Sequence, residues 1–218
     1  MSIEASVSDV RARIAKAAHR AGRSPGDIVL VAISKTAEAP AIIEAFKAGI
    51  THFGESRIQE ASEKLPALGE IRRHSTWHMV GHLQTNKVKN ALQLFDIIGS
   101  VDSERLARAI SGQAQRTVPV FLEINVGGET NKYGVAVEQA AGLLKSVSAL
   151  SKLEVRGLMT VAPIYSDPGQ ARPIFRTLRR LRDELGLKEL SMGMSDDFEV
   201  AVEEGATLVR IGRAIFSR

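Results

Sequence analysis

Apolar and polar positions alternate along this chain in two distinct patterns. The segment 7–21 places its apolar residues at helical spacing, and Gly22 and Pro25 end it. The run 28–33 that follows is apolar at every position. A continuous apolar run of this length is typical of a parallel strand that is buried on both faces.

The same alternation continues to the end of the chain. Helical patterns are expected at 39–47, 57–68, from about 84, and at 103–115, 137–150, 169–185 and 197–204. Strands are expected at 28–33, 50–54, 77–80, 94–99, 118–125, 153–159, 189–192 and 207–211. Repeated βα units favour a parallel sheet, either open and doubly wound or closed, and the count of eight favours closure. We therefore predict a single α/β domain over 1–218, a (β/α)₈ TIM barrel.

Composition narrows the classes of protein that remain. The chain has 218 residues, 44% of them hydrophobic and 25% charged, which is ordinary for a globular protein and short for a TIM barrel. Cysteine is absent, which excludes disulfides, thiolate chemistry and cysteine–zinc sites. No membrane-spanning run or signal-peptide pattern is found, so the cytoplasm is the expected location. The net charge of +4 suits a phosphorylated ligand without indicating a nucleic-acid binder.

Lys35 follows the first apolar strand directly. The C-terminal ends of barrel strands are where functional groups lie. Partial desolvation there would favour the neutral amine, which can attack an aldehyde. On position alone, however, a lysine that merely extends from the strand end into water is the favoured interpretation.

The loops after the last two predicted strands change this balance. In TIM barrels these loops often hold a phosphate. Gly193 and Gly212 allow the backbone to approach an anion closely, and the Ser195 hydroxyl can donate to it with nearby backbone N–H groups. An ordinary helix start is the alternative, with Ser195 or Asp196 as the N-cap and Glu199 completing a capping box. The two interpretations are compatible.

A lysine after the first strand and a phosphate site after the last two form the layout that pyridoxal 5′-phosphate (PLP) requires. Over nearly its whole length, the sequence resembles the YggS/PROSC family of PLP homeostasis proteins, whose barrel is similar to the N-terminal domain of alanine racemase. The motifs that carry the resemblance are Val31–Lys35, His52–Glu55, Trp77–Lys87, Gly157–Thr160, Ser191–Asp197 and Val209–Gly212.

The resemblance implies specific cofactor contacts and no metal. Lys35 is expected to form a Schiff base with PLP. The other expected contacts are Ser195, Gly212 and Arg213 at the phosphate, Arg210 at the pyridine nitrogen, and Met159 and Asn125 at the face and edge of the cofactor.

The sequence departs from the family pattern at four positions. Ser56 stands where the family usually has Asn, and Asn131 stands where it has Ser. Ser217 replaces a common Gly, and Phe198 a frequent Met. Any contact made by the usual Asn at position 56 is therefore in doubt, whereas Lys35 and the phosphate loops are unaffected.

Arg210 bears on the kind of function. Enzymes that use PLP as a strong electron sink place a carboxylate at the pyridine nitrogen. A guanidinium only donates hydrogen bonds, so it would leave that nitrogen unprotonated and weaken the sink. An internal ion pair of Arg210 with Glu123 or Asp196 is the alternative.

The hypothesis is a PLP carrier or regulator without fast turnover, with PLP-dependent apo-enzymes as partners and a monomeric state. A PLP-dependent amino-acid racemase is the main rival. It would need a second acid/base on the opposite face of the cofactor. The chain has only Tyr133 and Tyr165 as tyrosines, neither in a suitable motif, although Tyr165 follows the sixth strand. A scaffold without cofactor is the third option, and it leaves the lysine, serine and arginine unexplained.

Two weaker signals favour structural interpretations. His78 and His82 are four residues apart, as in some zinc sites, but they lie on a strand and a loop. Five arginines on the predicted helix 169–185 could contact RNA, but they fit the solvent face of an outer helix better because aromatic stacking groups are lacking.

Overall fold

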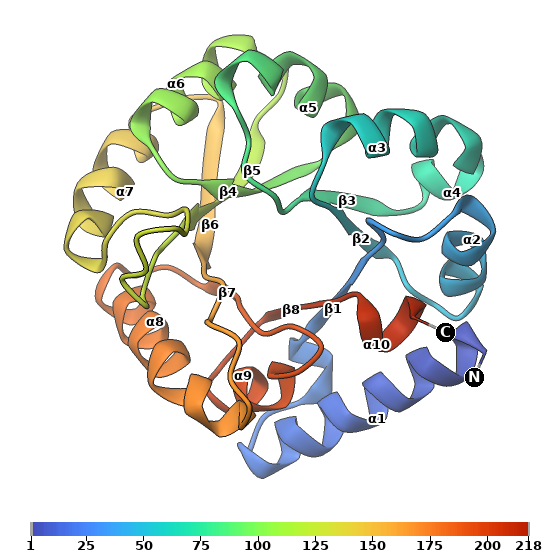
Figure 1. Ribbon diagram of the computed structural model, residues 1–218. Helices are drawn as coiled ribbons and strands as arrows, with labels where there is room; N and C mark the ends of the chain where they lie inside the picture. The colour runs from blue at the N-terminus through green and yellow to red at the C-terminus, as the bar shows by residue number, and fades with distance from the viewer. Residues whose placement is uncertain (1, 218) are drawn as a thin grey trace.

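A computed structural model describes residues 2–217. Its centre is a closed barrel of eight parallel strands in the order β1 to β8, with β8 pairing back onto β1 (Figure 1). The strands are β1 Val29–Ile33, β2 His52–Glu55, β3 Thr76–Met79, β4 Ile97–Val101, β5 Val118–Glu123, β6 Leu153–Met159, β7 Glu189–Ser191 and β8 Leu208–Ile211. The (β/α)₈ architecture predicted from the sequence is confirmed.

Helices surround the barrel as an outer ring (Figure 1). The α-helices are α1 Ile3–Arg20, α2 Ala39–Lys47, α3 Ile58–Lys64, α4 Glu70–Arg73, α5 Val88–Leu94, α6 Glu104–Gln113, α7 Ala140–Ser148, α8 Arg172–Glu184, α9 Phe198–Glu203 and α10 Arg213–Phe216. Short 3₁₀ turns are η1 Pro25–Asp27, η2 Leu65–Leu68, η3 Thr85–Lys87, η4 Val137–Gln139 and η5 Pro168–Ala171. Helix α1 precedes the first strand and packs against α9 and α10.

The prediction of a strand at 94–99 is wrong at its start. Leu94 ends helix α5, and strand β4 begins only at Ile97. Asp96 separates the two, since its carboxylate accepts a hydrogen bond from the backbone N–H of Trp77 at 2.8 Å. Local apolarity could not reveal this boundary, because the partner that fixes it lies on the neighbouring strand.

The core has two layers. Inside the barrel, strand residues alone form a buried cluster: Val31, Ile97, Phe121, Met159 and Leu208. Outside it, the strands pack against the helices, and the rings of Phe53 and Trp77 stack with centroids 5.1 Å apart. Filling of both faces by apolar side chains explains why the strand runs show little alternation.

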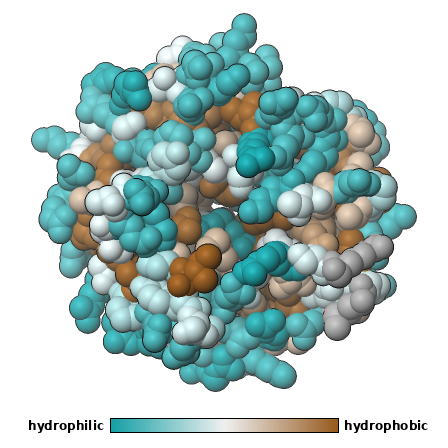
Figure 2. Space-filling model, viewed as in Figure 1, coloured by the Kyte–Doolittle hydropathy of each residue, from teal (hydrophilic) through white to brown (hydrophobic). Residues whose placement is uncertain are grey.

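The outer surface is mainly hydrophilic in the view along the barrel, with apolar residues near the centre (Figure 2). Among residues 2–217, no helix has the length and apolar character needed to cross a membrane.

Candidate functional site at the barrel mouth

A cavity of about 360 Å³ lies at the mouth of the barrel, the end at which the carboxyl ends of the strands lie. We call it the mouth cavity. Lys35, Ser195, Arg210, Gly212 and Arg213 all line it. These five predicted site residues lie at or just after the ends of strands β1, β7 and β8, which the closed barrel brings to one mouth.

Lys35 occupies a tight turn at the end of β1. The Ser34 N–H continues the sheet ladder to the Gly54 carbonyl at 3.0 Å, and the Ala37 N–H closes the turn on the Ser34 carbonyl at 2.9 Å. The side chain of Lys35 is exposed, so the expected partial desolvation is not found. Within residues 2–217 it makes no hydrogen bond or ion pair, so its amine can reach a ligand in the cavity.

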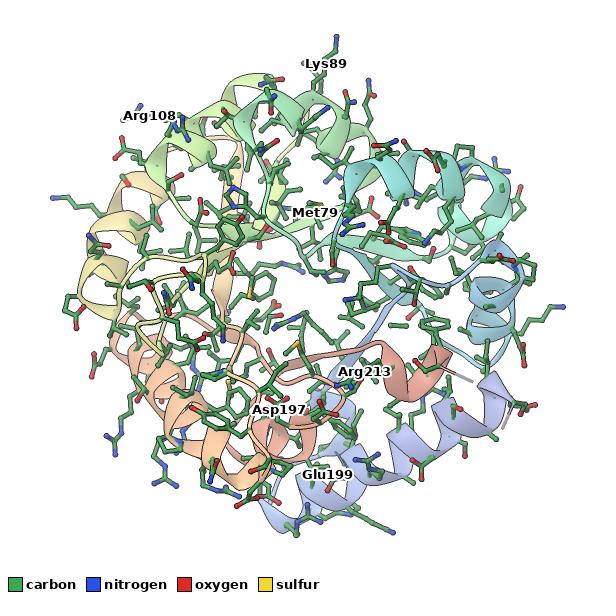
Figure 3. The ribbon with its side chains drawn as sticks, viewed as in Figure 1. Met79, Lys89, Arg108, Asp197, Glu199 and Arg213 are labelled. Atoms are coloured by element: carbon green, nitrogen blue, oxygen red, sulfur yellow. The ribbon has the colours of Figure 1, made fainter. Side chains whose placement is uncertain are left out.

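The loops after β7 and β8 are joined by the Ser195 side chain. The Ala214 N–H donates to Ser195 Oγ at 3.3 Å, and Arg213 forms an ion pair with Asp196. Arg213, at the start of helix α10, lies on the same side of the barrel as Asp197 (Figure 3). A hydroxyl, a glycine backbone and a guanidinium thus converge on one wall, which is a donor set suited to a phosphate.

The alternative of a capping box with Ser195 or Asp196 as the N-cap is not found at this loop. Asp197, not Ser195 or Asp196, precedes helix α9, and its Oδ1 accepts the Met194 N–H at 2.6 Å, within the preceding loop. Burial raises the pKa of Asp197, while the Met194 hydrogen bond and the charge of Arg210 oppose this effect. The carboxyl therefore shapes the loop, which leaves Ser195 available on the cavity wall.

Gly193 is required by the backbone of the β7–α9 loop. Its φ is +90°, and a Cβ there would lie 2.5 Å from the Ala201 Cβ. We expect Gly193→Ala to lower the free energy of unfolding by about 2–3 kcal/mol, from backbone strain and overlap.

Urea unfolding of Gly193→Ala against Gly142→Ala checks this. Gly142 lies in helix α7, and a Cβ added there would meet no other atom within 4 Å, so alanine should stabilise the helix by up to about 1 kcal/mol. Equal stability of the two variants would contradict the role given to Gly193.

Arg210 is buried inside the mouth. Its Nη1 donates to Ser191 Oγ and its Nη2 to the Thr160 carbonyl, both at 2.7 Å. Burial lowers the pKa of Arg210 to about 10, opposed by the charges of Glu123 and Asp197, so the guanidinium stays charged at neutral pH. The alternative of a direct ion pair with Glu123 or Asp196 is not found among the described residues.

Ser191 and the Thr160 carbonyl were missed by reasoning from the sequence. Ser191 ends β7, and its strand-end position was the available signal. The Thr160 carbonyl had none, because any residue supplies a backbone carbonyl.

Glu123 is a further buried group, considered from the sequence only as an ion-pair partner of Arg210. It is buried at the end of β5, and its Oε2 has no hydrogen-bond partner within residues 2–217. Burial raises the pKa of Glu123 to about 7, opposed by the nearby charge of Arg210 and reinforced by Asp102. Glu123 lines a separate cavity of about 150 Å³ rather than the mouth cavity, and its carboxyl interacts electrostatically with the guanidinium of Arg210, which does line the mouth.

Met159 and Asn125 do not line the mouth cavity. Met159 is buried within the apolar cluster inside the barrel. Asn125 lines a separate cavity of about 150 Å³, and its side-chain amide donates to the Glu129 carbonyl at 2.8 Å. Both residues follow or end strands, and a strand position does not reveal how deep a side chain lies.

The two histidines contact different side chains. His78 Nε2 lies 3.0 Å from His52 Nδ1, and burial with the neighbouring His52 lowers the pKa of His78 to about 3. His82 instead contacts Asp102 and stacks on Tyr133. Among residues 2–217, no group of three or more potential ligands could hold a metal ion.

The basic face of helix α8 is largely paired. Arg172, Arg176 and Arg179 each contact Glu204, which lies just after helix α9. Burial would raise the pKa of Glu204, but hydrogen bonds from Arg176 and Arg172 lower it. These arginines fasten α8 to its neighbour, which agrees with the structural interpretation of the basic helix.

Comparisons with known proteins agree with this geometry. Residues 6–217 match the family model described as the alanine racemase N-terminal domain. A pyridoxal phosphate homeostasis protein of Aquifex aeolicus is 43% identical over 96% of this chain and 95% of its own length. The structure of PipY from Synechococcus elongatus with PLP bound superposes with a TM-score of 0.84 at 35% identity, covering 99% of this chain and 100% of PipY.

An alanine racemase of Corynebacterium glutamicum is more distant. It shares 18% identity and a TM-score of 0.67, and the match covers 95% of this chain but 60% of the racemase. At this identity the likeness shows the fold alone.

Proposed function

Because the chain belongs to the family of pyridoxal phosphate homeostasis proteins, built on the alanine racemase N-terminal domain, we propose that it binds PLP in the mouth cavity. In this proposal residues 1–218 act as one PLP-binding barrel in PLP homeostasis, and Lys35 holds the cofactor as a Schiff base. The observation that carries it is the meeting of an exposed lysine, a serine hydroxyl, a glycine and two arginines around one cavity of about 360 Å³.

The residues of the cavity fit the chemical groups of PLP. When bound, PLP supplies an aldehyde that bonds reversibly to an amine and a ring that can withdraw electrons. Lys35 offers the amine. Ser195, Gly212 and Arg213 would hold the phosphate, and Arg210 would face the pyridine nitrogen with donors beyond the two already used.

Met159 and Asn125 are assigned lesser roles. Met159 would support the floor beneath the cofactor from inside the barrel. Asn125 would shape the neighbouring loop through its two hydrogen bonds to the Glu129 backbone.

The chemistry of Arg210 favours reversible binding of PLP over its use in catalysis. A guanidinium that only donates would keep the pyridine nitrogen unprotonated, so the ring would stabilise a carbanion poorly. We propose that the protein keeps PLP reversibly, without fast turnover, and passes it to PLP-dependent apo-enzymes.

The racemase alternative rests on Tyr165, which lines the mouth cavity and could serve as a second base. We expect the PLP-loaded protein to invert no amino acid at ordinary enzymatic rates, on the order of 1 per second or more. Chiral analysis after incubation with a panel of amino acids measures this, with Tyr165→Phe as the matched variant. Inversion at such a rate, lost in Tyr165→Phe, would replace the carrier function by a racemase.

The monomeric state and the cytoplasmic location are parts of the same proposal. Among residues 2–217, Tyr133 and Ile164 are the exposed large hydrophobic side chains, and no broad apolar face accompanies them. The paired arginines of α8 support the absence of a nucleic-acid partner. Light scattering of the PLP-loaded protein tests the monomeric state, for which we expect the mass of one chain, 23.6 kDa.

A further inference from the structure

A buried ion pair lies directly behind the turn that carries Lys35. Lys64, the last residue of helix α3, places its Nζ 2.9 Å from Glu55 Oε1 at the end of strand β2. The Glu55 side chain is fully buried and the Lys64 side chain is 13% exposed. The function proposed above uses neither residue.

Both members of the pair hold Ser34, the residue before Lys35. Ser34 Oγ donates to Glu55 Oε1 at 2.7 Å, and Lys64 Nζ donates to the Ser34 carbonyl at 2.7 Å. The same carbonyl accepts the Ala37 N–H that closes the turn. Lys35 and Thr36 are the two central residues of this turn. Lys64 therefore hydrogen-bonds the backbone of the first residue of the turn, Ser34.

Stability alone does not account for this arrangement. Taking a lysine and a glutamate out of water is costly, and apolar residues of similar volume often serve a buried position equally well. Glu55 Oε2 has no hydrogen-bond partner within residues 2–217, so the pair is also incompletely satisfied. The ammonium and the carboxylate do, however, fix both the side chain and the carbonyl of one residue, which apolar packing would not do.

Lys35 needs such a fixed base. Its side chain is exposed and makes no hydrogen bond or ion pair among the described residues, so nothing but the backbone sets where its long chain begins. We propose that Lys64 and Glu55 are positioning residues for Lys35, which act through Ser34 to aim its amine at the mouth cavity. This inference rests on the proposed PLP-binding function.

Two ligands separate positioning from general structural support. PLP has the aldehyde that bonds to Lys35, whereas pyridoxine 5′-phosphate has the same ring and phosphate without it. Misplacement of the Lys35 amine should weaken the binding of PLP but not that of pyridoxine 5′-phosphate. A small displacement of a reacting group can slow bond formation by a large factor. The measurements are the Kd of each ligand by titration and the rate at which the red-shifted absorbance of bound PLP develops.

The main variant is the pair K64M/E55Q, which removes both charges and leaves no buried ion alone. We expect this variant to raise the Kd for PLP about tenfold or more and to slow the appearance of the red-shifted absorbance by a similar factor. The Kd for pyridoxine 5′-phosphate should stay within about twofold of the wild-type value. S34A, which keeps the carbonyl contact to Lys64, should show a smaller loss of the same kind. K89M is the matched control, since Lys89 extends into solvent from helix α5 (Figure 3).

Two outcomes overturn the inference: an equal loss for both ligands in K64M/E55Q, or unchanged PLP binding in it. Failure of the proposed function looks different, because the wild type itself would then show no red-shifted absorbance with PLP. A wild type that binds PLP beside a K64M/E55Q variant that binds it equally well refutes the positioning role alone.

Discussion

Lys35→Ala is expected to abolish the red-shifted absorbance that PLP develops on the protein. Lys35 lines the mouth cavity with an exposed side chain that makes no hydrogen bond or ion pair among residues 2–217, and alanine has no amine to bond to the aldehyde. Absorbance titration of wild type and variant with PLP measures the loss.

The phosphate contacts should survive this change. Ser195 follows β7, and Gly212 and Arg213 follow β8, so Lys35→Ala should bind pyridoxine 5′-phosphate within a few-fold of the wild type. Lys89→Ala is the control for removal of a surface lysine. A variant that keeps the red-shifted band would show that another amine holds PLP, and the central proposal would be refuted.

Glu123→Gln is expected to stabilise the protein at alkaline pH and to have little effect under acidic conditions. The pKa of Glu123 is raised from 4.5 to about 7, mainly by burial. The folded state therefore binds a proton more tightly than the unfolded state does. Stability from this group is fully present below pH 4.5 and is lost as the pH rises towards 7. Above that pH the charged carboxyl costs about 3 kcal/mol.

Urea unfolding at several pH values measures this effect. Glutamine keeps the shape of the protonated carboxyl, so the difference between variant and wild type should grow from near zero at acidic pH to about 2–3 kcal/mol above neutrality. The pKa of about 7 already includes the opposing charge of Arg210, which favours the charged form of Glu123. Glu63→Gln, a substitution at an exposed residue, serves as the control for removal of a carboxylate. A difference that does not change with pH would show that Glu123 has an ordinary acidity in the folded protein.

The sequence was sufficient for the architecture. Continuous apolar runs separated by helical patterns indicated eight βα units, and the closed barrel has eight strands in sequential order. Parallel strands buried on both faces leave this signal locally, because most of their side chains on either face pack in the core. Boundaries were less secure, and β4 begins at Ile97 because Asp96 contacts a neighbouring strand.

Much of the candidate site could also be predicted. Lys35, Ser195 and Gly212 follow strands, and strand ends meet at one mouth in any closed parallel barrel. Depth and direction could not be predicted in this way, so Met159 lies in the core and Asn125 lines a different cavity.

By itself, then, the sequence determined the barrel architecture, the end of the barrel at which the site lies and the place of Lys35 after the first strand. These features depend on periodicity and on position relative to a strand. Only the tertiary structure decided what surrounds each charge. It showed that Arg210 donates to Ser191 and Thr160, and that Lys64 and Glu55 hold the turn of Lys35. Such contacts join residues on different βα units, and their geometry depends on how the whole barrel closes.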